Sequence, residues 1–194
     1  EALTVMAATL EALGAAHAVG VVHRDIKPEN IFLLNGADRC TGVKLLDFGI
    51  SKILSMQSAG GGLTRVGMAV GTPDYMSPEQ AGGGRVDGRA DLWSVGAVLY
   101  EAIARAKPFE GESYQQLVSR IILMPHIPLQ QRVPTAPRGV CDLIDRALRK
   151  EAGDRYPSAE AMVADVRHLL ATLPSDEAMG FHRVEIPEAQ RAGS

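Results

Sequence analysis

The stretch VVHRDIKPENIFLL, residues 21–34, constrains the fold of this chain more than any other part of its sequence. It sets charged side chains on a short loop and continues into an apolar run that suits a strand. Before it, apolar residues recur at steps of three and four, which predicts an amphipathic helix over residues 2–18 with a stop at Gly20. The loop is therefore expected to lie between a helix and a strand. The apolar stripe of that helix consists of Leu3, Met6, Leu10 and Leu13.

Two apolar runs with β-branched residues come after the charged part of this stretch, at residues 31–34 and 43–46. The segment between them contains NGADRCTG, and its Asn-Gly pair favours a tight turn. The pattern therefore predicts a small β-hairpin directly behind the loop.

Helices are expected to dominate the rest of the chain. Residues 91–104 leave little polar surface on any side, so this helix is expected in the middle of the domain. From residue 55 to 71 the periodicity is lost and a glycine run appears, which predicts a long mobile loop. The expected fold is mainly α with a small β-hairpin. Further helices are predicted at residues 113–124, 140–150 and 158–173.

Length and charge bound the organisation of the chain. Its 194 residues suffice for one domain with a single core, predicted at residues 1–173, followed by a linker or tail at 174–194. A formal net charge of -3 predicts no general attraction to nucleic acid or to anionic lipid. Any phosphate chemistry is therefore expected to be local.

The sequence predicts neither membrane insertion nor secretion for this segment. Its most apolar stretches are short and interrupted by Glu or His, and no secretory signal opens it. Cys40 and Cys141 are too few and too far apart for a disulfide framework or a zinc site. We therefore expect a cytoplasmic location for these residues, whether or not a longer protein is anchored in a membrane.

Oxygen ligands and one ammonium group are expected to converge beside the hairpin. Asp25 and Asn30 stand five residues apart on the loop, and Asp47 follows the second predicted strand. A carboxylate and an amide oxygen at one point suit magnesium when phosphate oxygens and waters complete its shell. A second carboxylate can accept a proton from a hydroxyl nucleophile, and Lys27 places positive charge where a phosphoryl group is transferred. The set points to phosphoryl transfer.

Each of these residues alone also has a structural interpretation, because Asp and Asn are common turn formers. Their combination is more specific. HRDIKPEN at 23–30, DFG at 47–49 and GTPDYMSPE at 71–79 resemble the catalytic loop, the magnesium aspartate and the end of the activation segment of protein kinases. The resemblance covers residues 1–173. The residue patterns VVHRDIKPEN, YMSPEQA and DRYPSAEAM are similar to those of bacterial serine/threonine kinases.

This resemblance implies the large C-terminal lobe of a kinase, acting with ATP and Mg²⁺. It implies that Asp25 is the base that orients the substrate hydroxyl, that Lys27 contacts the transferred phosphate, and that Asn30 and Asp47 hold magnesium. Thr72 matches the threonine whose hydroxyl bridges Asp25 and Lys27. The lysine and this threonine together resemble serine/threonine rather than tyrosine kinases.

The adenine pocket has one matching position in this sequence. Phe32 stands where an apolar side chain of the family forms the floor of that pocket. Leucine is commoner there, so an aromatic ring changes the shape of the surface offered to the nucleotide.

Further matches are implied to be structural. His23 is expected to pack against Phe48 in the core rather than to transfer protons. Asp91 opens the predicted central helix, where an aspartate can act as a cap, and the family uses it to hold the backbone of the catalytic loop. Glu79 matches the glutamate that pairs with a distant arginine, here Arg155. If that pair is buried, losing one partner would cost about 3 to 5 kcal/mol.

The resemblance also implies regulatory residues. Arg24 resembles the arginine that binds a phosphorylated activation loop, because a phosphate adds nearly two charges and acceptor oxygens that a guanidinium pairs. Thr64 in GGGLTRVG is expected to be the main activating phosphorylation site. Serines with a weaker claim are Ser51, Ser55 and Ser58.

A complete kinase domain includes a part that these residues do not supply. Its N-terminal lobe carries a glycine-rich loop, a lysine on the α- and β-phosphates and a hinge for adenine. We expect the chain, which starts at Glu1, to be a piece of a longer protein. Alone it is expected to be nearly inactive, because an open adenine face forgoes roughly 3 kcal/mol of apolar burial. It is also expected to expose apolar surface that the N-terminal lobe covers.

Three functions are compatible with these observations. The first is the catalytic lobe of an active serine/threonine kinase with protein substrates. The second is a non-catalytic kinase-like module that docks partners, which would not need the catalytic set in full. The third is a phosphotransferase for small molecules, which GTPDYMSPE disfavours because this segment suits an extended peptide. The residues that favour the first over the second are Asp25, Lys27, Asn30, Asp47 and Thr72.

Overall fold

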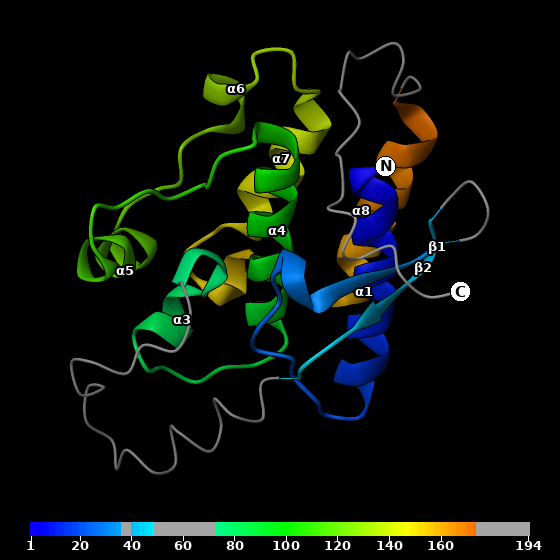
Figure 1. Ribbon diagram of the computed structural model, residues 1–194, viewed down its shortest axis with the longest axis horizontal. Helices are drawn as coiled ribbons and strands as arrows, with labels where there is room; N and C mark the ends of the chain where they lie inside the picture. The colour runs from blue at the N-terminus through cyan, green and yellow to red at the C-terminus, as the bar shows by residue number, and fades with distance from the viewer. Residues whose placement is uncertain (36–39, 49–72, 174–194) are drawn as a thin grey trace.

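The computed structural model of the chain describes residues 1–35, 40–48 and 73–173 (Figure 1). Within them the fold is mainly helical, with one two-stranded antiparallel sheet. The fold class expected from the sequence is therefore confirmed. The loop expected at 55–71 and the tail expected from residue 174 lie outside the described residues.

The five longer helices agree with those expected, with small shifts at their ends. Ser113 and Ser158 are N-caps whose hydroxyl oxygens accept hydrogen bonds from backbone N–H groups, so the helices begin one residue later than predicted. No helix within the described residues is both long and apolar enough to cross a membrane. The bounds are α1, Ala2–Ala18; α4, Arg89–Ala104; α5, Tyr114–Leu123; α7, Arg138–Ala147; and α8, Ala159–Thr172.

The end of α7 differs from the expected boundary at residue 150. The helix stops at Ala147, and the carbonyls of Arg149 and Lys150 accept hydrogen bonds from Arg155 at 2.7 and 2.8 Å. A side chain just beyond the helix thus folds back onto these carbonyls, which the local periodicity could not reveal.

Several short elements were not predicted, because three or four residues are too few to show a period. α3 has a full capping box, in which Ser77 and Gln80 satisfy each other's backbone N–H groups. The short elements are η1, Pro28–Asn30; η2, Pro73–Tyr75; α3, Pro78–Ala81; α6, Leu129–Arg132; and η3, Ala152–Asp154.

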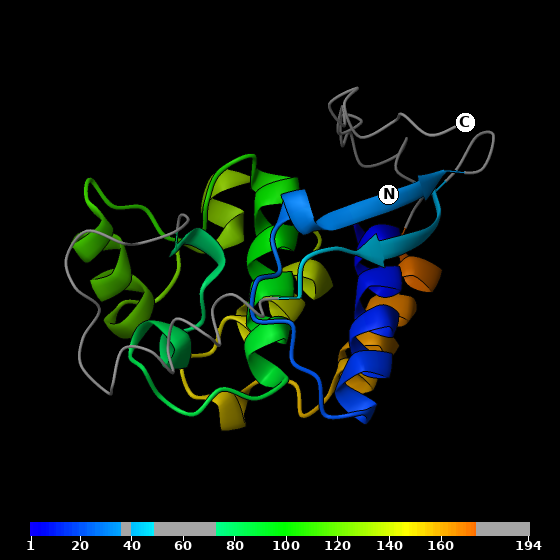
Figure 2. The same cartoon turned by 60° about the horizontal axis from the view of Figure 1, so that its bottom comes forward.

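The predicted hairpin is confirmed and packs across α1 near the start of the helix (Figure 2). β1 spans Ile31–Asn35 and β2 spans Cys40–Leu45, so the second strand begins three residues earlier than expected. Their register pairs Ile31 with Leu45. Beyond the strands, the N–H of Leu46 donates to the carbonyl of Asn30 at 2.9 Å, which carries the pairing into the polar loop.

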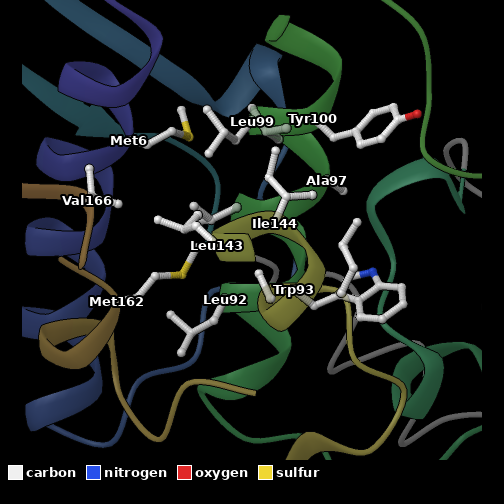
Figure 3. Close-up of a cluster of buried hydrophobic side chains, with 14 of the residues drawn as sticks. Met6, Leu92, Trp93, Ala97, Leu99, Tyr100, Leu143, Ile144, Met162 and Val166 are labelled. Carbon is white, nitrogen blue, oxygen red and sulfur yellow. The ribbon is translucent and has the colours of Figure 1, made fainter. Parts of the chain in front are cut away.

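α4 lies in the middle of the domain, as expected, and packs against α1, α7 and α8. Its approach to α7 is close: a Cβ at Gly96 would lie 2.7 Å from the Cβ of Ala147. The helix is a shared platform for the segments that surround it. Figure 3 shows its side chains meeting those of α1, α7 and α8, and the labelled residues are Met6, Leu92, Trp93, Ala97, Leu99, Tyr100, Leu143, Ile144, Met162 and Val166.

Candidate active site

The polar loop is fixed by its backbone to the first turn of α4. Asp91 accepts a hydrogen bond from the N–H of His23 at 2.9 Å and another from the N–H of Arg24 at 2.8 Å. The same carboxylate lies 2.8 Å from Nε2 of His17, near the end of α1. Asp91 is fully buried, so this single carboxylate joins α1, the loop and α4.

Two residues of the site have left-handed backbone conformations. Arg24 has φ 65° and Asp47 has φ 51°. Such conformations cost about 1 to 3 kcal/mol for residues with a Cβ and persist where surrounding contacts enforce them. At Arg24 the bond from its N–H to Asp91 is one such contact. The strain lies directly beside the residues expected to carry chemistry.

His23 is buried and uses both ring nitrogens in hydrogen bonds. Nε2 lies 2.9 Å from the carbonyl of Leu46, and Nδ1 accepts from the N–H of Asp25 at 3.3 Å. A carbonyl can only accept and a backbone N–H can only donate, which assigns the neutral tautomer with its proton on Nε2. The ring also lies 4.6 Å from that of Phe48, between centroids. His23 therefore tethers the loop to the chain after β2.

Asp25, Lys27 and Asn30 meet at one point. Nζ of Lys27 lies 3.0 Å from Oδ2 of Asp25. The amide nitrogen of Asn30 donates to the carbonyl of Asp25 at 2.7 Å and to its Oδ2 at 3.1 Å. Both side chains of the Lys27–Asp25 pair remain partly exposed, whereas Asn30 is buried. A carboxylate is thus held in place by an amide and an ammonium while it still faces solvent.

The donor set fits a magnesium ion. Because the amide nitrogen of Asn30 is committed to Asp25, its amide oxygen is the atom left to bind a cation. Asp47 is exposed and directly follows Leu46. The N–H of Leu46 donates to the carbonyl of Asn30, and its carbonyl accepts from the ring of His23. An amide oxygen and a carboxylate from neighbouring segments are hard ligands of the kind magnesium takes beside phosphate oxygens.

The remaining sequence-predicted residues divide into those that the structure describes and those that it does not. Phe32 lies in β1 and is half-buried, and Phe48 is half-buried against His23. Thr72 and Thr64 lie outside the described residues, as do the weaker phosphorylation candidates Ser51, Ser55 and Ser58.

Glu79 and Arg155 form a two-pronged ion pair, with both nitrogen–oxygen distances at 2.8 Å. The Arg155 side chain is 0% exposed and that of Glu79 is 16% exposed. Burial acts to raise the pKa of Glu79, but the hydrogen bonds and charge of Arg155 outweigh it and lower the pKa below its ordinary value. Because Glu79 belongs to α3 and Arg155 follows η3, this pair anchors the segment around η2 and α3 to the chain between η3 and α8.

A second cluster near η2 was missed by sequence reasoning. The Tyr75 hydroxyl donates to Glu101 and accepts from Lys107, and the Lys107 ammonium lies 2.7 Å from Glu101 and 3.7 Å from Asp74. Burial and the hydrogen bond to Glu101 raise the pKa of Tyr75. Burial also raises the pKa of Asp74, against the lowering effect of Lys107. These four side chains brace η2 against the far end of α4.

Two further contacts of the loop were also missed. Nε2 of Gln80 donates to the carbonyl of Arg24 at 2.9 Å, which joins α3 to the loop. His17 reaches Asp91 from a helix expected only to pack. Neither residue has a sequence signal that separates it from ordinary helical side chains, because the partners stand 56 and 74 positions away.

Comparison with known proteins covers most of the chain. The model of the family described as "Protein kinase domain" matches residues 1–166. Serine/threonine-protein kinase pkn3 of Myxococcus xanthus is 42% identical over 84% of this chain and 30% of its own length. Serine/threonine-protein kinase Pkn1 of the same organism is 40% identical over 82% of this chain and 22% of its own.

A more distant relative agrees. Serine/threonine-protein kinase PknB of Mycobacterium tuberculosis is 34% identical over 85% of this chain and 25% of its own length. The chain thus spans less than a third of the length of these relatives. With a family match that runs through the catalytic loop and the Glu79–Arg155 pair, the chain belongs to the protein kinase domain family.

Proposed function

We propose that this lobe transfers the γ-phosphate of ATP to serine or threonine hydroxyls of proteins when it is joined to an N-terminal kinase lobe. The observation that carries the proposal is the arrangement of Asp25, held by Asn30 and Lys27 on a loop whose backbone is tied to Asp91. The names of the relatives, which are serine/threonine-protein kinases, support the same class of acceptor.

Each polar residue has a separate role in this proposal. Asp25 accepts a hydrogen bond from the substrate hydroxyl, orients it and takes its proton as the phosphorus–oxygen bond forms. Lys27, paired with Asp25, stays close enough to stabilise charge on the transferred group. Thr72, which lies outside the described residues, is proposed to bridge the two. Asn30 and Asp47 hold Mg²⁺, which supplies positive charge to the phosphate oxygens when bound. Phe32 forms part of the floor under adenine.

Two predicted features extend the proposal. The domain is proposed to comprise residues 1–173, with a linker or tail at 174–194. The 194-residue chain alone is proposed to be nearly inactive, because it contains no glycine-rich phosphate loop to close the nucleotide site.

Regulation by phosphorylation is proposed to act through Arg24. Among the described residues its Nε atom is buried without a hydrogen-bond partner, which leaves a donor available for an anion. Phosphorylation of Thr64 would provide that anion. Phosphopeptide mapping of an active sample should find Thr64 modified, and an active sample with unmodified Thr64 would contradict this assignment.

The test uses protein made with a complete kinase domain and measures transfer of labelled phosphate from ATP to a serine or threonine peptide. Transfer should require Mg²⁺, and Asp25→Asn should lower kcat by roughly 100-fold or more while leaving the fold intact. Asp142→Asn is the matched control, because this aspartate is exposed on α7 far from the loop in sequence. Full activity of the Asp25→Asn variant would overturn the role proposed for Asp25. If the unsubstituted complete domain showed no transfer at all, the docking-module function would be favoured.

A further inference from the structure

Lys150 stands apart from the other lysines of the described residues in the kind of partner it has. Lys27 and Lys107 are paired with carboxylates, and Lys44 is exposed. Lys150 is half-buried, and its amine has no carboxylate partner anywhere in the described part of the chain. It is placed instead among neutral acceptors and aromatic rings.

The amine of Lys150 closes the C-terminal end of α5. It donates to the carbonyl of Ile121 at 2.6 Å and lies 3.5 Å from that of Arg120. In a continuing helix the Ile121 carbonyl would accept from the N–H four residues later, but that residue is Pro125, which has no N–H. Lys150 therefore satisfies a carbonyl that the helix itself cannot.

Aromatic rings line the other side of the amine. Nζ lies 4.1 Å from the ring centroid of Phe109 and 5.0 Å from that of Trp93. The two rings are stacked, with centroids 5.6 Å apart. The backbone of Lys150 is held as well, because its carbonyl accepts from Arg155. The amine is thus fixed in a cage that offers it no negative charge.

The charged groups around this cage disfavour a further positive charge. Burial, followed by the charge of Arg155, lowers the pKa of Lys150 from 10.5 to about 8. Arg155 is also paired with Glu79, and His126, which faces Phe109, is paired with Asp145. Burial lowers the pKa of His126 too, which disfavours a positive charge on this ring. A substantial fraction of Lys150 is therefore a free amine near pH 7.5, unlike an exposed lysine.

We propose that Lys150 is an acylation site, modified by small activated acyl compounds such as acyl phosphates, and that its modification displaces α5 from the lobe. In this step the lone pair of the neutral amine attacks the acyl carbonyl carbon. The carbon–nitrogen bond forms, the carbon–oxygen bond to phosphate breaks, phosphate leaves with the bonding electrons, and the amine proton passes to solvent.

The displacement follows from what acylation removes. An acylated Nζ has one N–H and no positive charge, so the Ile121 carbonyl loses its charged donor and the contacts with the two rings weaken. α5 packs against α3 and η2. A loosened α5 is therefore expected to loosen the segment proposed to hold the peptide substrate, and this last consequence rests on the proposed function.

The first experiment treats the 194-residue chain with acetyl phosphate at pH 7.5 and follows each lysine by peptide mass spectrometry. Lys150 should be acetylated about tenfold faster than Lys44, the exposed reference, because more of its amine is unprotonated. The excess should disappear in concentrated urea, where the cage is absent. A folded-state rate at Lys150 equal to or below that at Lys44 would overturn the proposal.

The second experiment follows the cage by fluorescence, because Trp93 is the one tryptophan of the sequence. Its emission should change in step with acetylation of Lys150, and amide exchange should accelerate in α5 but not in α8. Lys150→Arg, which keeps a donor but is not acetylated, should show neither change under the same treatment. Acetylation of Lys150 with unchanged emission and unchanged exchange in α5 would overturn the displacement of this helix.

A third readout separates this proposal from the proposed function. In a complete kinase domain, acetylation should raise the KM for a peptide substrate several-fold with a smaller change in the KM for ATP. If phosphate transfer is absent altogether, the proposed function fails while the labelling and fluorescence results still decide the case for Lys150. If transfer occurs but KM for the peptide is unaffected, the link from α5 to the peptide is wrong.

Discussion

The polar loop at residues 23–30 and the segment at 73–81 are both held against α4, but by different kinds of contact. The backbone of the loop meets α4 through one buried carboxylate, Asp91, which accepts hydrogen bonds from two backbone N–H groups. The other segment is held by several side chains, including Tyr75 and the Glu79–Arg155 pair, and part of this set is exposed. The difference teaches that the contact of the loop with α4 is concentrated in one buried residue, whereas the contacts of the neighbouring segment are shared among several side chains.

The largest expected effect comes from removing the buried carboxylate that joins the loop to α4. Asp91→Ala should lower the free energy of unfolding by about 3 to 5 kcal/mol, because two buried N–H groups and His17 lose their acceptor together. Urea unfolding of the 194-residue chain measures it. Asp142→Ala, on an exposed site of α7, should change the value by about 0.5 kcal/mol or less. A loss below about 1 kcal/mol at Asp91 would remove the contrast between the two regions.

The next largest effect tests the Glu79–Arg155 pair, which anchors the segment at 73–81. Arg155→Met should cost about 3 kcal/mol, because it leaves the Glu79 carboxylate half-buried without its partner and frees the carbonyls of Arg149 and Lys150. Adding Glu79→Met should recover part of the loss, as measured by the same unfolding experiment. If the double variant is no more stable than Arg155→Met, the ion pair is not what anchors this segment.

A change in α4 should affect both regions together. Gly96→Ala would put a Cβ within 2.7 Å of the Cβ of Ala147, and overpacking of this kind costs about 1 to 3 kcal/mol. Amide exchange should accelerate in the loop and in α3 alike, in contrast to the two variants above. Ala147→Gly in the same chain should restore stability, and failure of that rescue would place the strain elsewhere.

The smallest expected effect is the pH dependence of the stability that Glu79 contributes to the segment at 73–81. The pKa of Glu79 in the folded chain lies below its ordinary value of 4.5, so its contribution to stability is fully present above that pH. It is lost as the pH falls below 4.5 through the lowered pKa. The difference in free energy of unfolding between the native chain and Glu79→Gln should therefore shrink on acidification. A difference that stays constant from pH 7 to 3 would contradict the pairing.

Much of the fold could be predicted from the sequence because its long helices have clear apolar periods. The central place of α4 was predictable, since Leu92, Val95 and Leu99 stand among other apolar residues on every side of the helix. The end of α7 was not, because Arg155, just beyond the helix, takes over the carbonyls of Arg149 and Lys150. Periodicity records which face a helix buries, but it carries no information about a side chain that folds back onto the carbonyls.

The candidate site divides in the same way. Asp25, Lys27 and Asn30 were recognisable because they lie within six residues of one another, and they do meet at one point. The brace formed by Tyr75, Glu101 and Lys107 was not recognisable, because its members are spread over η2, α4 and the segment after α4 and look like ordinary surface residues in sequence.

The sequence by itself determined the family, the helical class of the fold and the chemical groups of the loop, because these depend on residue type and short spacing. The tertiary structure alone decided the tautomer of His23, the strain at Arg24 and the position of the Lys150 amine beneath α5. Each of these depends on partners brought together by packing. A hydrogen bond between residues far apart in sequence leaves no pattern in the chain, and it exists only once the core around α4 has formed.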